Sequence, residues 1–513
     1  MQQKPNVIII MADQLRYDAI GPYTPNINFL AEESVIFTRA YCSSPLCIPA
    51  RGSFFTGLYP NISGCIINGF EETDIQQRYI KNSIPNLYTV LEKTWNSWHI
   101  GKQHFCTQDK IDENPYTRTK WIRHKKEYFE FLEANKKNPP GGAGYRAYVP
   151  EMASGKITRV KEYSKPAIGR YEDGEEYFTD IYFTNKIIEA IRNRDTLKPL
   201  LINAMFHAPH PPFQIPEPWY SKVKEVDLPK NVAKWSIGQS PLQLYNLSGF
   251  IGSHYSYDEW KEIWKVYLGL VSLLDDCIGK IIDELKRQNL YENSLIIFTS
   301  DHGEMLGSHR LWQKMCMYEE AVRTPLFIKF PKSFLTKVNE VNELVSSIDI
   351  FPTICDFLGI KLEHTVSGTS LMPVVNGEKL NRNKIFIQFD GNGARGNFQR
   401  CVIEDQYKLI VDIFKDERFI ELYDVLNDEQ ESYNLSLDKK YKPLIEKLLN
   451  SLRLHTNETG DLLKLPLNIY EKFRKENINE KTFPGYGWNC CFMLLAIGSG
   501  FSMYTTNRRY YWF

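Results

Sequence analysis

Three short stretches of this 513-residue chain, residues 7–11, 200–206 and 294–299, are almost uninterrupted runs of apolar and β-branched residues. Runs of this length without polar alternation are typical of parallel strands that are buried on both faces. Residues 258–288 carry apolar side chains at helical spacing and lead directly into the third run. The pattern therefore predicts an α/β fold with a mostly parallel sheet flanked by helices.

Polar residues follow the first and third runs, where each predicted strand ends. Asp13 and Gln14 follow the first run, and Asp301 and His302 follow the third. Because ligands bind beyond the carboxyl ends of parallel strands, such a sheet would bring these two pairs together. Three oxygen donors and one imidazole suit a hard or borderline divalent cation, such as Ca²⁺, Mg²⁺ or Mn²⁺. The structural alternative for a single Asp here is a cap on the next turn.

Residues 47–57 contain a thiol, a proline and an arginine within little more than one helical turn. Because proline fixes φ and lacks an N–H, Pro49 predicts the first turn of a helix, with Cys47 at or just before its N-terminus. The unpaired N–H groups there favour negative charge on a thiolate or on a bound oxyanion. Arg51 lies four residues beyond Cys47 and therefore on the same face. A buried cysteine, a capping turn and a surface arginine are the structural alternative.

Basic residues follow two further predicted strands. Lys102 and His104 come directly after an apolar stretch that ends near residue 100, where both side chains could simply be solvated. His207 and His210 lie among three prolines after the 200–206 run, which makes their loop rigid and non-helical. Spacing alone assigns no reaction to these residues.

The succession of motifs along the chain resembles that of the type I sulfatases of the alkaline phosphatase superfamily. The motifs are C-x-P-x-R followed by Thr-Gly at 47–57, G-K-x-H at 101–104, P-H-x-P at 209–212, S-D-H-G at 300–303 and Y-E-E-x-x-R-x-P at 318–325. They occur in the family's order over residues 6–461, which is far more specific than any one motif. The resemblance implies an alkaline-phosphatase-like fold, with a large mixed, mostly parallel sheet and a small C-terminal antiparallel sheet plus helix.

The resemblance also implies a metal centre and a modified residue. A maturation enzyme would oxidise Cys47 to formylglycine, whose hydrated form is the family's nucleophile. The implied metal ligands are Asp13, Gln14, residue 47, Asp301 and His302. Many sulfatases carry a second Asp where this chain has Gln14, and Asn where it has His302. These two departures lower the charge of the ligand set, but Ca²⁺ stays the expected ion, with Mg²⁺ and Mn²⁺ as alternatives.

The remaining catalytic roles are likewise implied by the resemblance. One group would hold the sulfate oxygens and protonate the leaving group, namely Lys102, His210 and Lys314, with His207 in reserve. His104 would act as the base that releases the covalent sulfate. Arg51 would orient and stabilise the hydrated aldehyde.

The length predicts more than one structural unit. We expect a catalytic domain over 1–383 with a poorly periodic, substrate-facing insertion at 109–176, an antiparallel subdomain over 384–461, and an extension of unknown role over 462–513. Lys plus Arg and Asp plus Glu are each 62, so the balanced charge indicates no nucleic-acid partner. No signal peptide or membrane span is evident, and the ten scattered cysteines are typical of reduced thiols, so we expect a cytoplasmic protein. The sequence gives no indication of oligomeric state.

The expected function is hydrolysis of a sulfate ester on a sugar or another small organic molecule. The nearest alternative is a phosphonate monoester hydrolase or phosphodiesterase of the same superfamily, because these enzymes also use formylglycine with Asp-Gln and Asp-His pairs. A third alternative is a non-catalytic relative that binds anions or sugars. A plausible ligand or cation at every implied position argues against that third alternative.

Overall fold

The computed structural model of the chain describes residues 4–69, 75–153, 156–392, 396–415, 417–463 and 465. Its centre is an eight-stranded sheet with strand order β13-β2-β12-β11-β1-β9-β4-β5. The pairs among β11, β1, β9, β4 and β5 are parallel, and only β12 runs antiparallel to its neighbours. The strands are β1 (Asn6–Asp13), β2 (Val35–Phe37), β4 (Asn96–Gly101), β5 (Lys120–Arg123), β9 (Leu200–Pro209), β11 (Ser294–Ser300), β12 (Leu326–Lys329) and β13 (Glu340–Val341).

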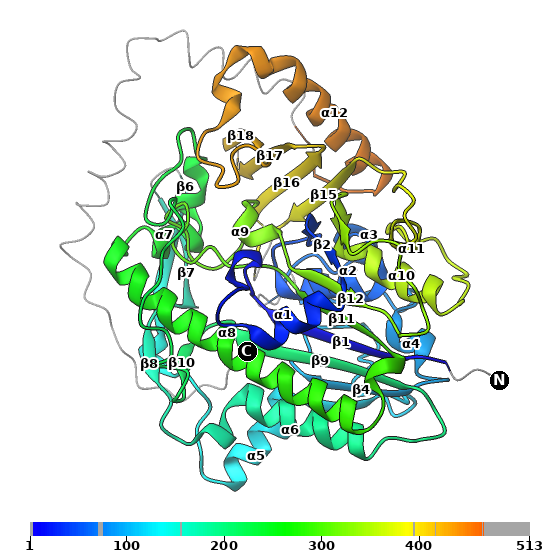
Figure 1. Cartoon of the computed structure of the whole chain (residues 1–513). Coiled ribbons are helices and arrows are strands. Elements are labelled where there is room, and N and C mark those ends of the chain that lie inside the picture. The colour runs from blue at the N-terminus through cyan, green and yellow to red at the C-terminus, as the bar shows by residue number, and fades with distance from the viewer. Residues whose placement is uncertain are drawn as a thin grey trace.

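The central strand β1 is buried on both faces, as its continuous apolar run predicts. Ile8 and Ile10 belong to one core cluster, whereas Val7 and Ile9 belong to a second, because successive side chains point to opposite faces. Figure 1 shows the long helix α8 on one side of the sheet and α2 on the other. The first core is covered by α1 (Pro25–Glu32), α6 (Thr179–Arg192) and α8 (Tyr257–Arg287), and the second by α2 (Cys47–Thr56), α4 (Leu87–Leu91) and α10 (Ile350–Phe357).

A second, four-stranded antiparallel sheet follows in the C-terminal third of the chain. Its strands pair in sequence order, and α12 packs on it through Leu448 and Leu452. The fold class predicted from the sequence is therefore confirmed. The elements are β15 (Lys384–Phe389), β16 (Asn397–Glu404), β17 (Tyr407–Phe414), β18 (Glu417–Asp424) and α12 (Lys442–Glu458).

Residues 109–176, which are poorly periodic in sequence, nevertheless contain regular structure. This stretch supplies β5, an edge strand of the main sheet, and a two-stranded antiparallel hairpin. Charged residues interrupt the apolar ones in both hairpin strands, so neither strand gives a continuous hydrophobic run. The elements beyond β5 are α5 (Phe129–Ala134), β6 (Arg146–Ala153), β7 (Lys156–Ser164) and β8 (Ile168–Arg170), of which β8 pairs with β10 (Phe213–Ile215).

Short elements complete the description. No helix within the described ranges is long and apolar enough to cross a lipid bilayer. Nearly all of the predicted extension over 462–513 lies outside the described residues. The short elements are α3 (Pro60–Ser63), α7 (Leu247–Gly252), α9 (Glu319–Val322), α11 (Met372–Val375), and β3 (Ala40–Tyr41), which pairs with β14 (Val345–Ser346).

Candidate active site

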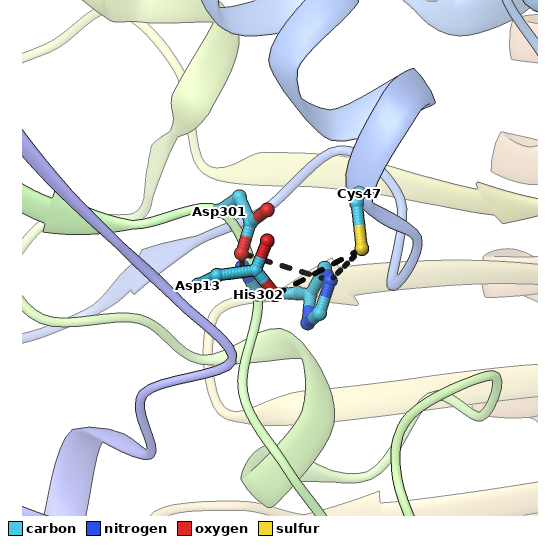
Figure 2. A group of neighbouring side chains, drawn as sticks. All are labelled: Asp13, Cys47, Asp301 and His302. Carbon is cyan, nitrogen blue, oxygen red and sulfur yellow. Dashed lines mark hydrogen bonds and ion pairs between the residues drawn. The ribbon is translucent and has the colours of Figure 1, made fainter. Parts of the chain in front are cut away.

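The two acidic strand ends meet at the carboxyl edge of the central sheet. The parallel register pairs Ala12 of β1 with Ser300 of β11, so Asp13 and Asp301 follow at neighbouring positions. The backbone N–H of Asp301 donates to the carbonyl of Ala12 at 3.2 Å. Ligand atoms of Asp13, Cys47, Asp301 and His302 all lie within 4.8 Å of one another, and all four residues are buried (Figure 2). The sequence prediction that these strand ends converge is confirmed.

Cys47 is the first residue of α2, which begins at the predicted position. The preceding Leu46 is extended and supplies no side-chain cap. Instead, the Oδ1 of Asn68, from a later loop, accepts from the N–H of Ile48 at 3.2 Å. The helix ends at Gly57, whose φ of 69° is in the left-handed region that glycine favours. The Cys47 thiol is thus presented to the carboxylates from a helix N-terminus, with Sγ 3.1 Å from Nε2 of His302 and 4.0 Å from Oδ1 of Asp13.

Arg51 joins the two carboxylates. Its Nε donates to Asp301 Oδ2 at 2.9 Å, and its Nη2 donates to Asp13 Oδ2 at 3.0 Å. Nη1 donates to the carbonyl of Lys102 at 3.1 Å. Burial would lower the pKa of Arg51, but Asp301 and Asp13 raise it above its ordinary value. The guanidinium therefore stays charged and fixes the spacing of the strand ends.

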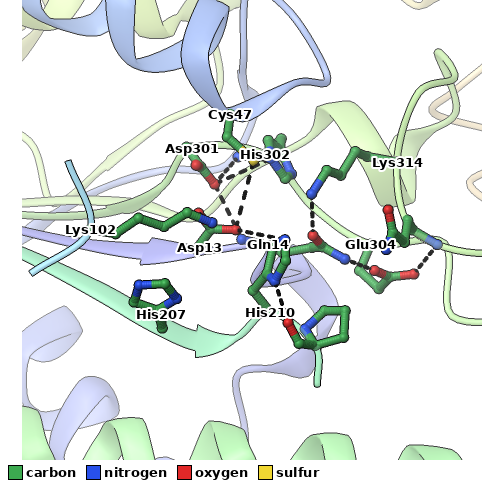
Figure 3. A network of polar contacts seen from close by, with 12 residues as sticks. Asp13, Gln14, Cys47, Lys102, His207, His210, Asp301, His302, Glu304 and Lys314 are labelled. Carbon is green, nitrogen blue, oxygen red and sulfur yellow. Dashed lines mark hydrogen bonds and ion pairs between the residues drawn. The ribbon is translucent and has the colours of Figure 1, made fainter. Parts of the chain in front are cut away.

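Two lysines lie on opposite sides of the pair formed by Asp13 and Asp301. Lys102 Nζ lies 2.6 Å from Asp13 Oδ2, and Lys314 Nζ donates to Oε1 of Gln14 at 2.5 Å. Gln14 has a φ of 68°, which is uncommon for a residue other than glycine. Its Nε2 donates to Oε2 of Glu304, so Glu304 and Lys314 together fix the amide (Figure 3). Lys102 and Lys314 are both buried, and they bring positive charge to the centre.

Two histidines that border this centre, His104 and His210, have lowered pKa values, whereas Asp301 and Cys47 raise the pKa of His302 against the effect of burial. His210 Nε2 lies 3.9 Å from Asp13 Oδ1, and its Nδ1 lies 2.6 Å from the carbonyl of Pro211. Burial, followed by the charge of Lys102, holds the pKa of both His104 and His210 well below the ordinary value. The Nδ1 of His104 is buried and has no hydrogen-bond partner among the described residues. A neutral imidazole can accept a proton, which is compatible with the base role predicted for His104.

The charges of the centre also act on its acids and on the thiol. Burial would raise the pKa of Asp13, but the charges of Lys102 and Arg51 hold it well below its usual value. Burial and Asp13 would likewise raise the pKa of the Cys47 thiol, which Lys314, Lys102 and His302 leave lower than ordinary. The site thus stabilises negative charge at the start of α2.

The donor set fits the metal ion that the family resemblance implies. Asp13 and Asp301 offer carboxylate oxygens, Gln14 an amide oxygen and His302 an imidazole nitrogen, with residue 47 beside them. Hard and borderline divalent cations take such mixed oxygen and nitrogen sets. The arrangement can therefore hold a divalent cation next to the side chain of residue 47.

Ten residues were predicted for the site, and direct polar contacts join nine of them into one network. His104 lies outside these contacts but interacts electrostatically with Lys102, Arg51 and Asp13. The network residues are Asp13, Gln14, Cys47, Arg51, Lys102, His210, Asp301, His302 and Lys314.

Sequence reasoning missed three residues that shape the site. Glu304 directly follows the S-D-H-G motif, and this position was the available signal for its role. Asp180 accepts from the N–H groups of His207 at 2.7 Å and Ala208 at 3.2 Å, which fixes the loop that carries His210. Burial raises the pKa of Asp180 to about 6. Neither Asp180 nor Asn68 lies near a recognised motif, so only the fold reveals them.

Comparisons with known proteins assign the chain to a family. A family model described as Sulfatase matches residues 5–360, and one described as N-sulphoglucosamine sulphohydrolase, C-terminal, matches residues 307–458. The two matched models define a hydrolase of the alkaline phosphatase superfamily. Within that superfamily, the chain belongs to the sulfatase family and is a sulfuric ester hydrolase.

Similar proteins extend over most of the chain. An uncharacterized sulfatase, YidJ, of Escherichia coli (strain K12) is 27% identical, with 90% of this chain and 88% of that protein covered. An arylsulfatase of Clostridium perfringens (strain 13 / Type A) is 26% identical, with 87% and 93% covered. The phosphonate monoester hydrolase of Agrobacterium radiobacter has a similar fold, with a TM-score of 0.70, 22% identity, and 88% and 96% covered. The catalytic fold is thus shared almost from end to end.

Proposed function

We propose that this chain hydrolyses a small organic sulfate ester by means of formylglycine made from Cys47 and one divalent cation, for which Ca²⁺ is the first candidate. The observation that carries the proposal is the position of Cys47 Sγ, at a helix N-terminus, 3.1 Å from His302 Nε2 and 4.0 Å from Asp13 Oδ1. An aldehyde at this position would face the carboxylates and the lysines when hydrated. The arylsulfatase relative supports the substrate class.

The cation, when bound by Asp13, Gln14, Asp301 and His302, would act as a Lewis acid that lowers the pKa of a hydroxyl and neutralises sulfate charge. Lys102 and Lys314 would hold two of the sulfate oxygens, since their ammonium groups border the centre from opposite sides. Arg51 keeps both carboxylates in place throughout, because its guanidinium bonds to each of them.

The reaction would proceed in two displacements at residue 47. In the first, one hydroxyl of the hydrated aldehyde releases its proton to solvent, and its oxygen forms a bond to sulfur as the ester oxygen leaves. Lys314 supplies the proton that the leaving alcohol takes up, because His210 is neutral in the free protein. In the second, neutral His104 takes the proton of the remaining hydroxyl. The electron pair of that O–H bond then forms the carbonyl. The C–O bond to the sulfate breaks, sulfate leaves, and the aldehyde is regenerated.

The test is turnover of an aryl sulfate by the full chain after coexpression with a formylglycine-generating enzyme. Wild-type protein should be active, and its peptide containing residue 47 should be lighter than the cysteine form. Cys47→Ala should abolish turnover without changing the circular dichroism spectrum. Activity in purified Cys47→Ala, or an unmodified peptide mass in fully active protein, would contradict the mechanism.

A phosphonate monoester is the second candidate substrate, and two observations favour keeping it. The chain has Asp13-Gln14 and Asp301-His302 pairs, and the fold aligns with 96% of a phosphonate monoester hydrolase. Both esters present a tetrahedral monoanion to the same lysines. Comparison of kcat/KM for an aryl sulfate and an aryl phosphonate monoester separates the two, and a large preference for the phosphonate would reverse the assignment.

A further inference from the structure

Three buried side chains outside the catalytic centre converge on one point. His309, Glu320 and Glu431 come from a loop, from α9 and from the segment after β18, and their ligand atoms all lie within 4.8 Å of one another. Their exposed fractions are 0%, 3% and 0%. The site therefore joins the segment that carries His309 and Glu320 to the distant segment that carries Glu431, and all three side chains are buried.

The atoms that face one another lack hydrogen-bond partners. His309 Nε2 lies 3.7 Å from Glu320 Oε2, which is beyond hydrogen-bond distance. Within the described part of the chain, neither atom has any other hydrogen-bond partner. These two unpaired atoms come from different elements and face each other, so one occupant could satisfy both. An imidazole nitrogen and a carboxylate oxygen aimed at each other can share a cation.

Each of the three side chains is oriented by a contact through its other polar atom. His309 Nδ1 lies 2.9 Å from Ser236 Oγ, Glu320 Oε1 accepts from Asn231 Nδ2 at 2.7 Å, and Glu431 Oε2 accepts from the N–H of Glu319 at 2.7 Å. The ring of His309 is also stacked on Tyr318, with ring centroids 4.0 Å apart. Metal ligands are typically fixed by such outer contacts. The remaining atom of each ligand then points inward.

The charges in this region also favour a cation. Lys408 Nζ lies 2.7 Å from Glu319 and 2.8 Å from Glu431, so it is shared between these two carboxylates. The Glu320 carboxylate contacts the neutral side chains of Asn231 and His309 instead. The nearby guanidinium of Arg16 lies 2.7 Å from Asp18 and is engaged there. Because a buried carboxylate requires a counter-charge, a cation beside Glu320 would complete the balance.

We propose that His309, Glu320 and Glu431 form a second metal site that binds one borderline divalent cation, with Zn²⁺ as the best match. One imidazole and two carboxylates are ligands that Zn²⁺ accepts in tetrahedral sites, and water or a further carboxylate oxygen would complete the set. Glu431 Oε1 can keep its contact with Lys408, since a carboxylate oxygen has two lone pairs.

The second site would stabilise the active site indirectly. The carbonyl of Glu320 accepts from the N–H of Glu304 at 2.8 Å, and Glu304 in turn holds Gln14. A cation bound by Glu320 would therefore fix α9 against the segment that follows Asp301. Glu320 also lines a cleft of about 420 Å³ in which the acidic side chains of Asp18, Asp227 and Glu429 outnumber the basic ones of Arg16 and Lys230.

The test uses the full-length Asp13→Asn, Asp301→Asn variant, which lacks the carboxylates of the catalytic centre. After incubation with ZnCl₂ and removal of excess zinc, elemental analysis should find one zinc per chain, and zinc should raise Tm relative to EDTA-treated protein. Adding Glu320→Gln should abolish both effects, because the amide keeps the Asn231 contact but turns a ligand oxygen into NH₂. Adding Glu319→Gln, on the neighbouring residue, should leave one zinc per chain, because Glu319 contacts Lys408 and is not a ligand of the proposed site.

A chain that retains no zinc in the Asp13→Asn, Asp301→Asn background would overturn the proposal, and so would equal zinc binding after Glu320→Gln. Should the Glu320→Gln protein fail to fold, anomalous diffraction at the zinc edge from zinc-soaked crystals of the wild-type chain decides the matter. A peak between His309 Nε2 and Glu320 Oε2 supports the site, and its absence refutes it.

Discussion

Glu304 fixes the orientation of Gln14 by accepting from its Nε2, which leaves the Gln14 oxygen facing Lys314. The other oxygen of Glu304 is held by the N–H groups of Leu306 at 3.0 Å and Gln313 at 2.5 Å. The carboxylate therefore cannot turn without losing two backbone contacts. A residue that touches neither the thiol nor the two aspartates thus sets the direction of an implied metal ligand.

We expect Glu304→Gln to impair the site while leaving the fold intact. The two backbone N–H groups require an oxygen at Oε1, so the new NH₂ would meet the NH₂ of Gln14. One amide must turn, and the Gln14 oxygen would then leave Lys314. Changes to groups that orient a metal ligand typically lower metal affinity or activity by about 10- to 100-fold. Metal titration and kcat for an aryl sulfate measure the effect.

The Glu304→Gln, Gln14→Glu double variant provides the matched control. In this reversed pair, the new amide at position 304 can donate to the new carboxylate at position 14, whose other oxygen can still accept from Lys314. Partial recovery of metal affinity relative to Glu304→Gln is the expected coupling. If the single variant binds metal and turns over as the wild type does, Glu304 does not position Gln14.

Arg51→Lys should lower activity severely. An ammonium group keeps the charge but cannot bond at once to Asp13, Asp301 and the Lys102 carbonyl, as the guanidinium does. A displacement of these carboxylates by about 1 Å would reduce kcat on the order of 100-fold. Steady-state kinetics and a thermal melt provide the measurement.

Arg400→Lys is the matched control for Arg51→Lys. Arg400 is also buried and bonds to Asp390 at 3.0 Å and Asp461 at 2.6 Å, but it lies in the C-terminal sheet. Arg400→Lys should lower Tm about as much as Arg51→Lys does, while kcat stays at the wild-type value. Equal kcat values for Arg51→Lys and Arg400→Lys would show that Arg51 has only a structural role.

The strand ends could be predicted because a buried parallel strand appears in the sequence as a short apolar run, and parallel strands align their carboxyl ends. The convergence of Asp13 and Asp301 could therefore be predicted from the sequence. The two strand ends are far apart in the chain, since Gln14, which follows Asp13, is 287 residues from Asp301. The edge strand β5 and the hairpin of β6 and β7 could not be predicted in this way, because these strands mix charged with apolar residues. Asp180 and Asn68 act through backbone N–H groups of other segments, and such contacts leave no local pattern.

The C-terminal sheet should lose stability as the pH rises towards 7. Burial raises the pKa of both Asp412 and Glu421 to about 7. Asp412 accepts from the hydroxyl of Ser240, and Glu421 accepts from its backbone N–H. Their folded-state pKa values exceed the unfolded values, so their contribution is fully present below about pH 4 and lost as the pH rises through 7. Tm measured from pH 5 to pH 8 should therefore fall more in the wild type than in Asp412→Asn. At pH 8 the free energy of unfolding of Asp412→Asn should exceed that of the wild type by about 1–3 kcal/mol.

Asp438→Asn is the control for this pH dependence. Asp438 is exposed, and hydrogen bonds from the N–H and side chain of Lys440 lower its pKa, so its contribution is already complete above pH 5. This variant should reproduce the wild-type decline. A wild-type Tm that stays level from pH 5 to pH 8 would mean that both buried carboxyls are ionised throughout.

Gly303→Ala should damage the site by steric displacement. A Cβ at Gly303 would lie 1.9 Å from the carbonyl oxygen of Glu320, a backbone atom that cannot rotate away. The segment would have to move from α9, breaking the 2.9 Å bond from the Gly303 N–H to the carbonyl of Ala321, and Asp301 and His302 would move with it. We expect a loss of about 1–3 kcal/mol in the free energy of unfolding and about 100-fold in kcat.

Gly21→Ala is the control, since no atom lies within 4 Å of its Cβ position, and it should match the wild type in thermal melts and kinetics. Wild-type kcat in Gly303→Ala would show that α9 yields without disturbing the strand end.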